Sequence, residues 1–394
     1  MEEEMKKTII ITAVLSITIL AGCYNTLTNK QNGENSPRGS GNEAYAALPT
    51  EKTNIKGINP FTFKEDNYQE QNIYEADGGK ILVKSDKLYL FDVQDQKVVA
   101  EAPLKSFDLH EEYYVTEEGY CVVGTEFTES QRITKACYYN KNLDIVQEFN
   151  LNEVLGEPYI PVQRIAVAKT GKKIAYATSK ELFIYDLDKK EKLILLNLGS
   201  ENTEANKGLT ILSVIAFFDK DTKLAFIGTG FEEKGENEQT TVGTISADGS
   251  VIVNEKADLL RLRHMEVTDD YIIFSENTYP TNTGEPAGKV IIIDNATGQI
   301  LRHTLQDKNE GSNVFLSEKG KYFMTYLQNG DKELIYRIYD TKTGKLMKEM
   351  KQEFEGKTDE KYMKIYIQIF DDINEFIAVS AFYNSEPMVT INEF

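Results

Sequence analysis

From residue 57 onward, hydrophobic residues occur in short runs that polar turns separate. Some runs alternate with polar residues and others are fully hydrophobic. Both patterns are typical of β-strands, half-buried in the first case and fully buried in the second. No segment shows the period of a long amphipathic helix, although residues 151–155 could form a single helical turn. The pattern therefore predicts an all-β body over residues 57–394.

The strand pattern repeats along the chain. One unit covers residues 165–196 and another covers residues 314–347, and each is consistent with four strands. Both have a Gly-Lys turn between the first two strands and Tyr-Asp at the end of the third. A polar residue closes the third strand in six units, namely Asp92, Asn140, Asp186, Ser246, Asp294 and Asp340. Four-stranded units of about 40–50 residues are typical of β-propeller blades, because one small sheet cannot bury both of its faces alone.

The number of blades follows from the strand count. Six complete units start near Ile73, Leu109, Ile165, Ile211, Met265 and Val314. A seventh starts at Ile365 and has three strands before the chain stops, whereas a spare segment, residues 58–63, precedes the first unit. We therefore predict a seven-bladed β-propeller in which the N-terminal strand closes the last blade. An eight-bladed ring with one degenerate unit is the alternative. If the N-terminal strand closes the ring, deletion of residues 55–66 should destabilise the whole body.

The turns of these units resemble those of bacterial TolB-type and related WD-like propeller repeats. That family has Ser-Pro-Asp-Gly-Lys before an apolar strand and Tyr-Asp later. Residues 169–173 and 318–321 match the turn in part, and residues 77–80 keep its Asp-Gly start, but the Pro is absent. The resemblance implies a propeller over residues 70–394. It leaves the function open, because propellers include enzymes, binding proteins and scaffolds.

The N-terminus carries a targeting pattern. Lys6 and Lys7 precede an apolar stretch at residues 9–21, which is too short to cross the ~30 Å hydrocarbon core as a helix. The following Leu20-Ala21-Gly22-Cys23 resembles the bacterial lipoprotein signal. That resemblance implies cleavage before Cys23 and a diacylglyceryl group on its thiol, with palmitate as an expected acyl chain. An ordinary secretory signal or a short anchor helix is the alternative.

These features divide the chain into three parts. Residues 1–22 are the expected signal peptide, residues 23–56 the lipidated cysteine and a flexible tether, and residues 57–394 the propeller. The tether assignment rests on its Asn, Gly, Ser and Thr content and its lack of hydrophobic periodicity. We expect the protein at the cell membrane, lipid-anchored and facing outside the cytoplasm.

Composition excludes several functions. The net charge of −19 argues against nucleic-acid binding, because a duplex repels a surface of its own sign. Three cysteines and three histidines are too few for a zinc-finger type of cluster, and we predict neither a metal nor a cofactor. Quinone-dependent propeller dehydrogenases use tryptophan docking motifs, and the chain has no tryptophan.

The central channel is the most promising place for a ligand. In a propeller, first strands line the channel, so residues at their starts converge near its mouth. Here these include Asn72, His110, Arg164, Ser213, Arg263, His264, Asn313 and Lys364. The four basic ones, Arg164, Arg263, His264 and Lys364, suggest a site for an anion or an acidic peptide, since guanidinium groups suit carboxylates and phosphates. The alternative is that these charges pair with nearby acids or face solvent.

Other candidate residues have simpler explanations. Two loops between second and third strands look long, at residues 228–239 and 277–288, and the first is acidic enough to consider calcium. Asp219 and Asp221 resemble a catalytic carboxylate pair, as do Asp371 and Asp372, but both pairs fall in turns where Asp is common.

Two of the cysteines could form a disulfide. A hairpin centred on Glu129 would make Cys121 and Cys137 direct cross-strand partners, which permits a disulfide in an exported protein. Two buried free thiols are the alternative.

Taken together, the sequence favours a monomeric, membrane-anchored lipoprotein whose propeller binds a protein partner or an anionic ligand without catalysis. A propeller hydrolase or lactonase-like enzyme acting at the channel mouth is one alternative. A structural factor in envelope assembly is the other.

Overall fold

The computed structural model describes residues 72–394 with several gaps, the longest at 200–207, 232–237, 277–287, 354–362 and 383–387. The expected signal peptide, the lipidated Cys23 and the tether therefore lie outside the described residues. Within the part described, no helix is long and apolar enough to cross a membrane.

The described strands form consecutive antiparallel sheets, each built from strands in sequence order. The first sheet contains β1 (Asn72–Ala76), β2 (Lys80–Lys84), β3 (Lys87–Asp92) and β4 (Lys97–Pro103). The second contains β5 (Leu109–Thr116), β6 (Gly119–Phe127), β7 (Arg132–Asn140) and β8 (Ile145–Asn150). The third contains β9 (Ile165–Val167), β10 (Lys173–Ala177), β11 (Glu181–Asp186) and β12 (Glu191–Asn197). The fourth contains β13 (Leu209–Phe218), β14 (Lys223–Phe231), β15 (Glu238–Ser246) and β16 (Val251–Lys256).

The remaining sheets continue the same order. The fifth contains β17 (Leu262–Val267), β18 (Tyr271–Glu276), β19 (Lys289–Asp294) and β20 (Ile300–Thr304). The sixth contains β21 (Val314–Leu316), β22 (Tyr322–Asn329), β23 (Glu333–Asp340) and β24 (Leu346–Glu353). The last sheet has three strands, β25 (Met363–Phe370), β26 (Glu375–Phe382) and β27 (Met388–Glu393).

In the described part of the chain, three short helices connect the sheets. They are α2 (Leu151–Leu155), η1 (Val162–Arg164) and η2 (Lys308–Ser312). The single helical turn expected at residues 151–155 is thus confirmed. The side chain of Asn150 caps its N-terminus by accepting a hydrogen bond from the Asn152 N–H, and Gly156 ends it with a positive φ of 72°.

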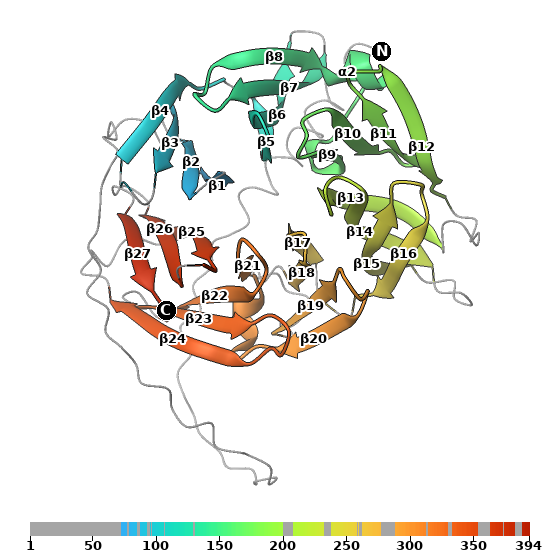
Figure 1. The fold of residues 1–394 in the computed structure, drawn as a ribbon. Coiled ribbons are helices and arrows are strands. Elements are labelled where there is room, and N and C mark those ends of the chain that lie inside the picture. The colour runs from blue at the N-terminus through green and yellow to red at the C-terminus, as the bar shows by residue number, and fades with distance from the viewer. Residues whose placement is uncertain are drawn as a thin grey trace, which may run out of the picture. The chain divides into compact units, whose positions relative to one another are not determined.

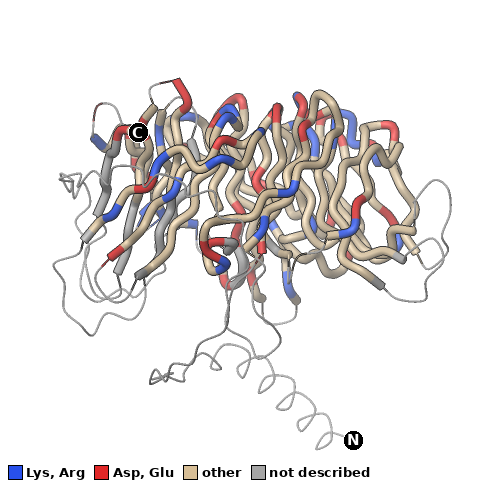
Figure 2. The backbone as a smooth tube through the Cα atoms, turned by 90° about the horizontal axis from the view of Figure 1, so that it is seen from below, with Lys and Arg blue, Asp and Glu red and all other residues tan. Residues whose placement is uncertain are grey.

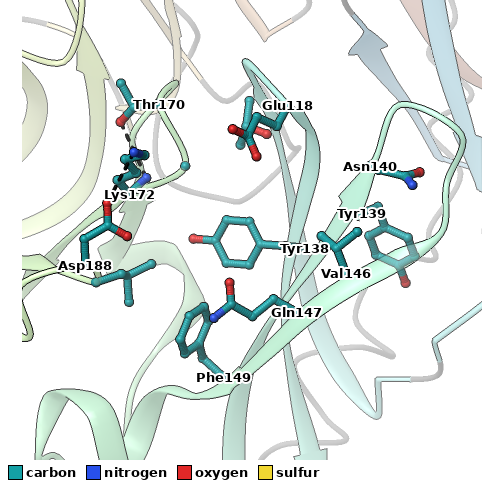
Figure 3. Close-up of a pocket in the computed structure, with 13 residues that line it drawn as sticks. Glu118, Tyr138, Tyr139, Asn140, Val146, Gln147, Phe149, Thr170, Lys172 and Asp188 are labelled. Carbon is teal, nitrogen blue, oxygen red and sulfur yellow. Dashed lines mark hydrogen bonds and ion pairs between the residues drawn. The ribbon is translucent and has the colours of Figure 1, made fainter.

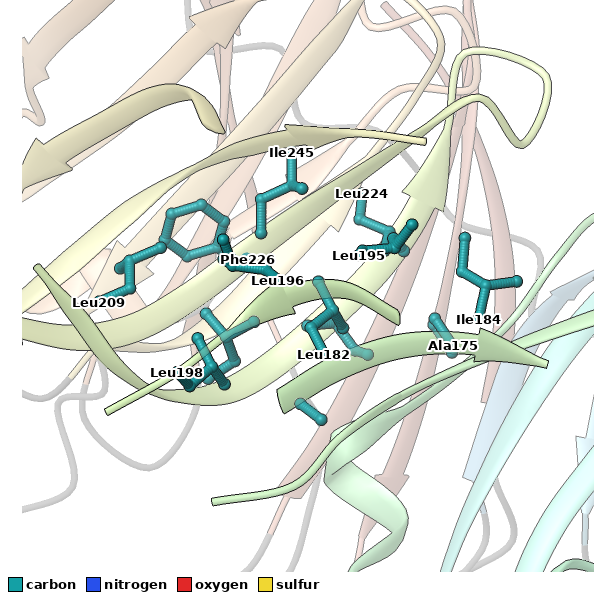
Figure 4. Close-up of a cluster of buried hydrophobic side chains, with 14 of the residues drawn as sticks. Ala175, Leu182, Ile184, Leu195, Leu196, Leu198, Leu209, Leu224, Phe226 and Ile245 are labelled. Carbon is teal, nitrogen blue, oxygen red and sulfur yellow. The ribbon is translucent and has the colours of Figure 1, made fainter. Parts of the chain in front are cut away.

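The sheets are arranged as blades around a central axis, with the first strand of each nearest the centre (Figure 1). Hydrophobic clusters fill the spaces between neighbouring sheets. Between the third and fourth sheets, for example, Leu182 packs in one cluster with Phe226 and Ile245 (Figure 4). A further cluster joins Phe91 of the first sheet to Phe370 of the last one, which brings the two ends of the described chain together. Each sheet is therefore buried by its neighbours on both sides, as the sequence pattern predicted.

The propeller architecture is confirmed, but the blade count is corrected. The described residues form six complete four-stranded blades, and not the seven or eight that we predicted. The strands after residue 363 form a three-stranded sheet. The segment expected to complete it, residues 58–63, lies outside the described residues.

The polar residue at the end of each third strand has a clear local role. All six predicted positions are the last residues of β3, β7, β11, β15, β19 and β23. Asp294 illustrates the arrangement, because its carboxylate accepts hydrogen bonds from the N–H groups of Ala296 at 3.1 Å and Thr297 at 3.0 Å. This side chain closes the turn into the fourth strand, which explains why Asp, Asn or Ser recurs there.

Figure 2 shows the ring from its side, with basic and acidic residues interspersed along the blades in view. Residues of both charges are therefore mixed on this side of the ring.

Candidate functional site at the channel mouth

The structure places the four predicted basic residues at equivalent points of the innermost layer. Arg164 ends η1 directly before β9, Arg263 and His264 are the second and third residues of β17, and Lys364 is the second residue of β25. All four thus lie at the start of a first strand or directly before it. Among the described residues, Arg164 has no acidic partner within ion-pair distance.

Three of the first strands have a β-bulge in their first half, at positions that the sequence had singled out. In β5, Leu109 pairs with Thr125 and Glu111 pairs with Gly124, so His110 is left out of the ladder. The same happens at Arg263 in β17, and at Ser213 in β13. Bulges bend a strand, re-aim its residues and are frequent at functional sites. The propeller therefore departs from regular pairing on three first strands near this end of the channel.

His264 links two neighbouring blades beside the channel. Its Nε2 lies 3.0 Å from the carbonyl oxygen of Val314 and 3.3 Å from Oε1 of Glu266. The other oxygen of Glu266 accepts a hydrogen bond from the N–H of Leu316. Burial lowers the pKa of His264, but the hydrogen bond with Glu266 and its charge outweigh burial, so the pKa is raised overall. His264 is therefore part of a structural link as well as of the predicted basic group.

Acidic residues also reach the channel, which the sequence analysis did not anticipate. Glu111 on β5 accepts hydrogen bonds from Lys84 Nζ at 2.6 Å and Tyr113 hydroxyl at 2.8 Å. The protein packed around its neighbour Glu112 disfavours the charged form and raises the pKa of that carboxyl. The consecutive acids on a first strand were the available signal. The channel mouth is thus a mixed site, with cationic groups on the third, fifth and last sheets and carboxylates on the second.

A solved structure shares the propeller architecture of this chain. The described chain is similar to the β-propeller domain of Cps50 (Swd1) from Myceliophteria thermophila, at 12% sequence identity and a TM-score of 0.53, covering 88% of this chain and 100% of that one. The fold is a WD40-like β-propeller. A chain of the mitotic checkpoint complex matches at 10% identity and a TM-score of 0.49, covering 94% of this chain and 100% of that one. No family model and no curated protein sequence matches the chain.

The predicted disulfide of this WD40-like propeller is wrong, because the hairpin register differs by one residue. Cys121 pairs with Tyr138, and Cys137 pairs with Val122. The chain reverses through a four-residue loop, in which the Thr128 N–H donates to the carbonyl of Gln131 at 2.9 Å. A one-residue shift puts the two side chains on opposite faces of the sheet.

The opposite faces give the two cysteines different surroundings. Cys121 packs toward the third sheet and Cys137 toward the first, and both are buried free thiols. Burial raises the pKa of Cys137 to about 11 and that of Cys121 further.

The other candidate positions are structural or lie partly outside the described residues. The loop expected at residues 228–239 is shorter than predicted, because β14 continues to Phe231 and β15 starts at Glu238. Most of the loop at residues 277–288 is not described. Within the described ranges, no group of three or more His, Cys, Asp or Glu could hold a metal ion.

The acidic turns of the propeller connect neighbouring blades. Asp221 accepts hydrogen bonds from the backbone N–H groups of Lys169 at 2.7 Å and Thr170 at 2.9 Å in the preceding blade. Asp371 likewise accepts one from Lys319 N–H at 2.6 Å. These carboxylates stabilise blade contacts, in agreement with the prediction that they are turn residues.

Proposed function

We propose that this protein is a lipid-anchored, extracytoplasmic lipoprotein whose propeller binds a protein partner, or an anionic ligand, at the channel mouth without catalysis. In this proposal Cys23 carries the lipid, residues 24–56 form the tether, and the propeller is the recognition module. The propeller fold itself supports a binding role. The Leu20-Ala21-Gly22-Cys23 motif supports the anchor and the location.

The clustering of bulged first strands around cationic positions is the observation that carries the binding proposal. His110, Ser213 and Arg263 are left out of regular strand pairing on three different sheets. Arg164 has no acidic partner among the described residues. Cationic residues in the innermost layer of a rigid ring suit a carboxylate or phosphate group.

A protein partner with acidic side chains fits this arrangement. The similar Cps50 (Swd1) domain shows the same fold at low identity and therefore supports the architecture of the recognition module rather than any particular partner.

Binding is tested with the triple variant Arg164→Ala, Arg263→Ala, Lys364→Ala in cross-linking on living cells, followed by identification of the captured proteins. The matched control replaces three exposed lysines in turns elsewhere, Lys190, Lys220 and Lys342, with Ala. We expect the triple variant to lose a captured protein that the wild type and the control retain, with thermal stability unchanged or raised. Equal capture by all three proteins would contradict the proposal, as would strong destabilisation by the triple variant.

The anchor is tested separately by metabolic labelling with palmitate. We expect the wild type to incorporate the label and partition with membranes, and Cys23→Ser to lose both properties. Label on the Cys23→Ser protein, or an unlabelled wild type, would contradict the lipoprotein assignment.

A further inference from the structure

A pocket of about 260 Å³ lies between the second and third blades, away from the channel mouth. It is bounded by β7 and β8 of the second blade, and by the turn before β10 and the turn after β11 of the third blade (Figure 3). Its volume is near the lower end of small-molecule sites, which begin at about 300 Å³. The pocket therefore has room for roughly one ring of a ligand.

The inner wall of this pocket is aromatic and apolar. Tyr138 and Phe149 meet edge to face, with ring centroids 5.8 Å apart. Val146 and Leu187 complete the apolar wall, and the Val146 side chain is 62% exposed. A second pocket at the equivalent place between the fourth and fifth blades has one aromatic residue, Phe218, beside Thr244, Ile252 and Val253. The pair of contacting aromatic rings therefore distinguishes the first pocket from the second.

Tyr138 carries an unsatisfied polar group in this wall. Its side chain is only 8% exposed, and its hydroxyl makes no hydrogen bond to the described residues. The thiol of Cys121 lies beside the hydroxyl, without the geometry of a hydrogen bond. In Figure 3 the hydroxyl points toward the space between Glu118 and Asp188. A buried hydroxyl without a partner costs about 1–3 kcal/mol, so a ligand that supplies a partner would gain from it.

The rim of the pocket is polar and mixed in charge. Glu118 and Gln147 are exposed, and Lys172 lies 3.3 Å from Asp188 in an exposed ion pair. Two carboxylates face a single ammonium group, which disfavours an anionic ligand. The rim offers both donors and acceptors, as a neutral ligand with several hydroxyl groups requires.

From these features we infer that the pocket between the second and third blades binds one neutral sugar ring. The apolar C–H face of a pyranose would lie against Tyr138, Phe149 and Val146. One sugar hydroxyl would pair with the Tyr138 hydroxyl, and the others with Glu118 and Gln147. This site is independent of the channel mouth, so its failure would leave the proposed function intact.

The inference is tested by titrating the full chain with methyl glycosides of glucose, galactose and N-acetylglucosamine. Saturation-transfer NMR follows the binding. Tetrasaccharides of glucose and N-acetylglucosamine distinguish a free sugar from a glycan chain as the source. We expect saturable binding of at least one methyl glycoside, weakened about tenfold by Tyr138→Phe. Val146→Trp should fill the pocket and abolish binding, and it should leave folding intact because Val146 is exposed.

Tyr336→Phe is the matched control, because it removes the same atom elsewhere. The Tyr336 hydroxyl donates to Gln352 Oε1 at 2.9 Å and is buried. We expect this variant to lose stability and keep sugar binding, whereas Tyr138→Phe should keep stability and weaken binding about tenfold. The absence of saturable binding to every probe would overturn the inference. Binding that survives both Tyr138→Phe and Val146→Trp would also overturn it, as would tighter binding of an amine such as arginine methyl ester than of every sugar.

Discussion

Removal of the carboxylate of Glu310 should destabilise the propeller more than removal of any exposed acid. Glu310 is fully buried in η2. Its carboxylate accepts hydrogen bonds from the hydroxyls of Thr325 and Tyr339, each at 2.8 Å, and from the Asp307 N–H at 2.8 Å. It also forms an ion pair with Arg337, whose side chain is 14% exposed. A single side chain thus satisfies four groups across β22, β23 and the loop before β21.

The expected cost follows from what Glu310→Ala leaves behind. The variant leaves the buried hydroxyl of Thr325 without its acceptor and removes one of the two acidic partners of Arg337. Breaking a buried ion pair costs about 3–5 kcal/mol, a large share of the 5–15 kcal/mol that typically stabilises a domain. Glu349→Ala is the matched control, because Glu349 binds the same Arg337 at 2.8 Å but is 28% exposed. The control should cost about 1 kcal/mol or less.

Urea unfolding followed by circular dichroism measures both variants. We expect the midpoint of Glu310→Ala to fall several times further than that of Glu349→Ala, with an unchanged slope. If Glu310→Ala does not fold, Glu310→Gln provides the comparison, since it keeps one acceptor oxygen and should be intermediate. Equal midpoints for the Glu310 and Glu349 variants would refute the argument that this network stabilises the sixth blade.

Three further predictions concern titration, thiols and blade contacts. Lys105 and Lys135 hold the pKa of Glu148 at about 2, below its ordinary 4.5, so the stability from this carboxylate is present above pH 4.5 and lost as the pH falls toward 2. Glu148→Gln should therefore flatten the dependence of the urea midpoint on pH across that window, and an unchanged dependence would count against it. Cys121 and Cys137 should resist alkylation in the native protein and both react after denaturation without reductant; a missing thiol would indicate a bridge. Asp221→Ala should cost about 2 kcal/mol in a thermal melt, because it leaves two backbone N–H groups unpaired, and a cost below that of Asp219→Ala would contradict the blade-contact role.

The sequence predicted the blades well because their signals are local. The Asp, Asn or Ser at each third-strand end closes a turn with its own side chain, so its chemistry is visible without knowing the neighbouring strands. Hydrophobic runs likewise predicted the strands, and the observed strand ends differ from the predicted ones by a few residues. For example, β13 starts at Leu209 and not at Ile211.

The sequence failed where the outcome depends on register or on packing between sheets. Predicting the cysteine pairing required the exact number of residues in the loop between β6 and β7. The observed register differs from the predicted one by one residue, which puts Cys121 and Cys137 on opposite faces of the sheet. The bulges at His110 and Arg263 and the burial of Glu310 depend on how neighbouring strands and sheets pack, which no local pattern records. Closure by residues 58–63 stays a prediction, because that segment lies outside the described residues.

The most direct test of partner binding at the channel mouth is site-specific photo-cross-linking on living cells. Ser213 is exposed and forms one of the two bulges in β13, so a photoreactive residue there would report on the channel mouth. Lys342, exposed in the turn after β23, provides the control position. We predict that the probe at Ser213 captures a discrete protein that the probe at Lys342 does not, and that Arg164→Ala, Arg263→Ala and Lys364→Ala together abolish this capture. The same captured proteins at both positions, or capture unaffected by the three substitutions, would contradict the proposal that the channel mouth binds a partner.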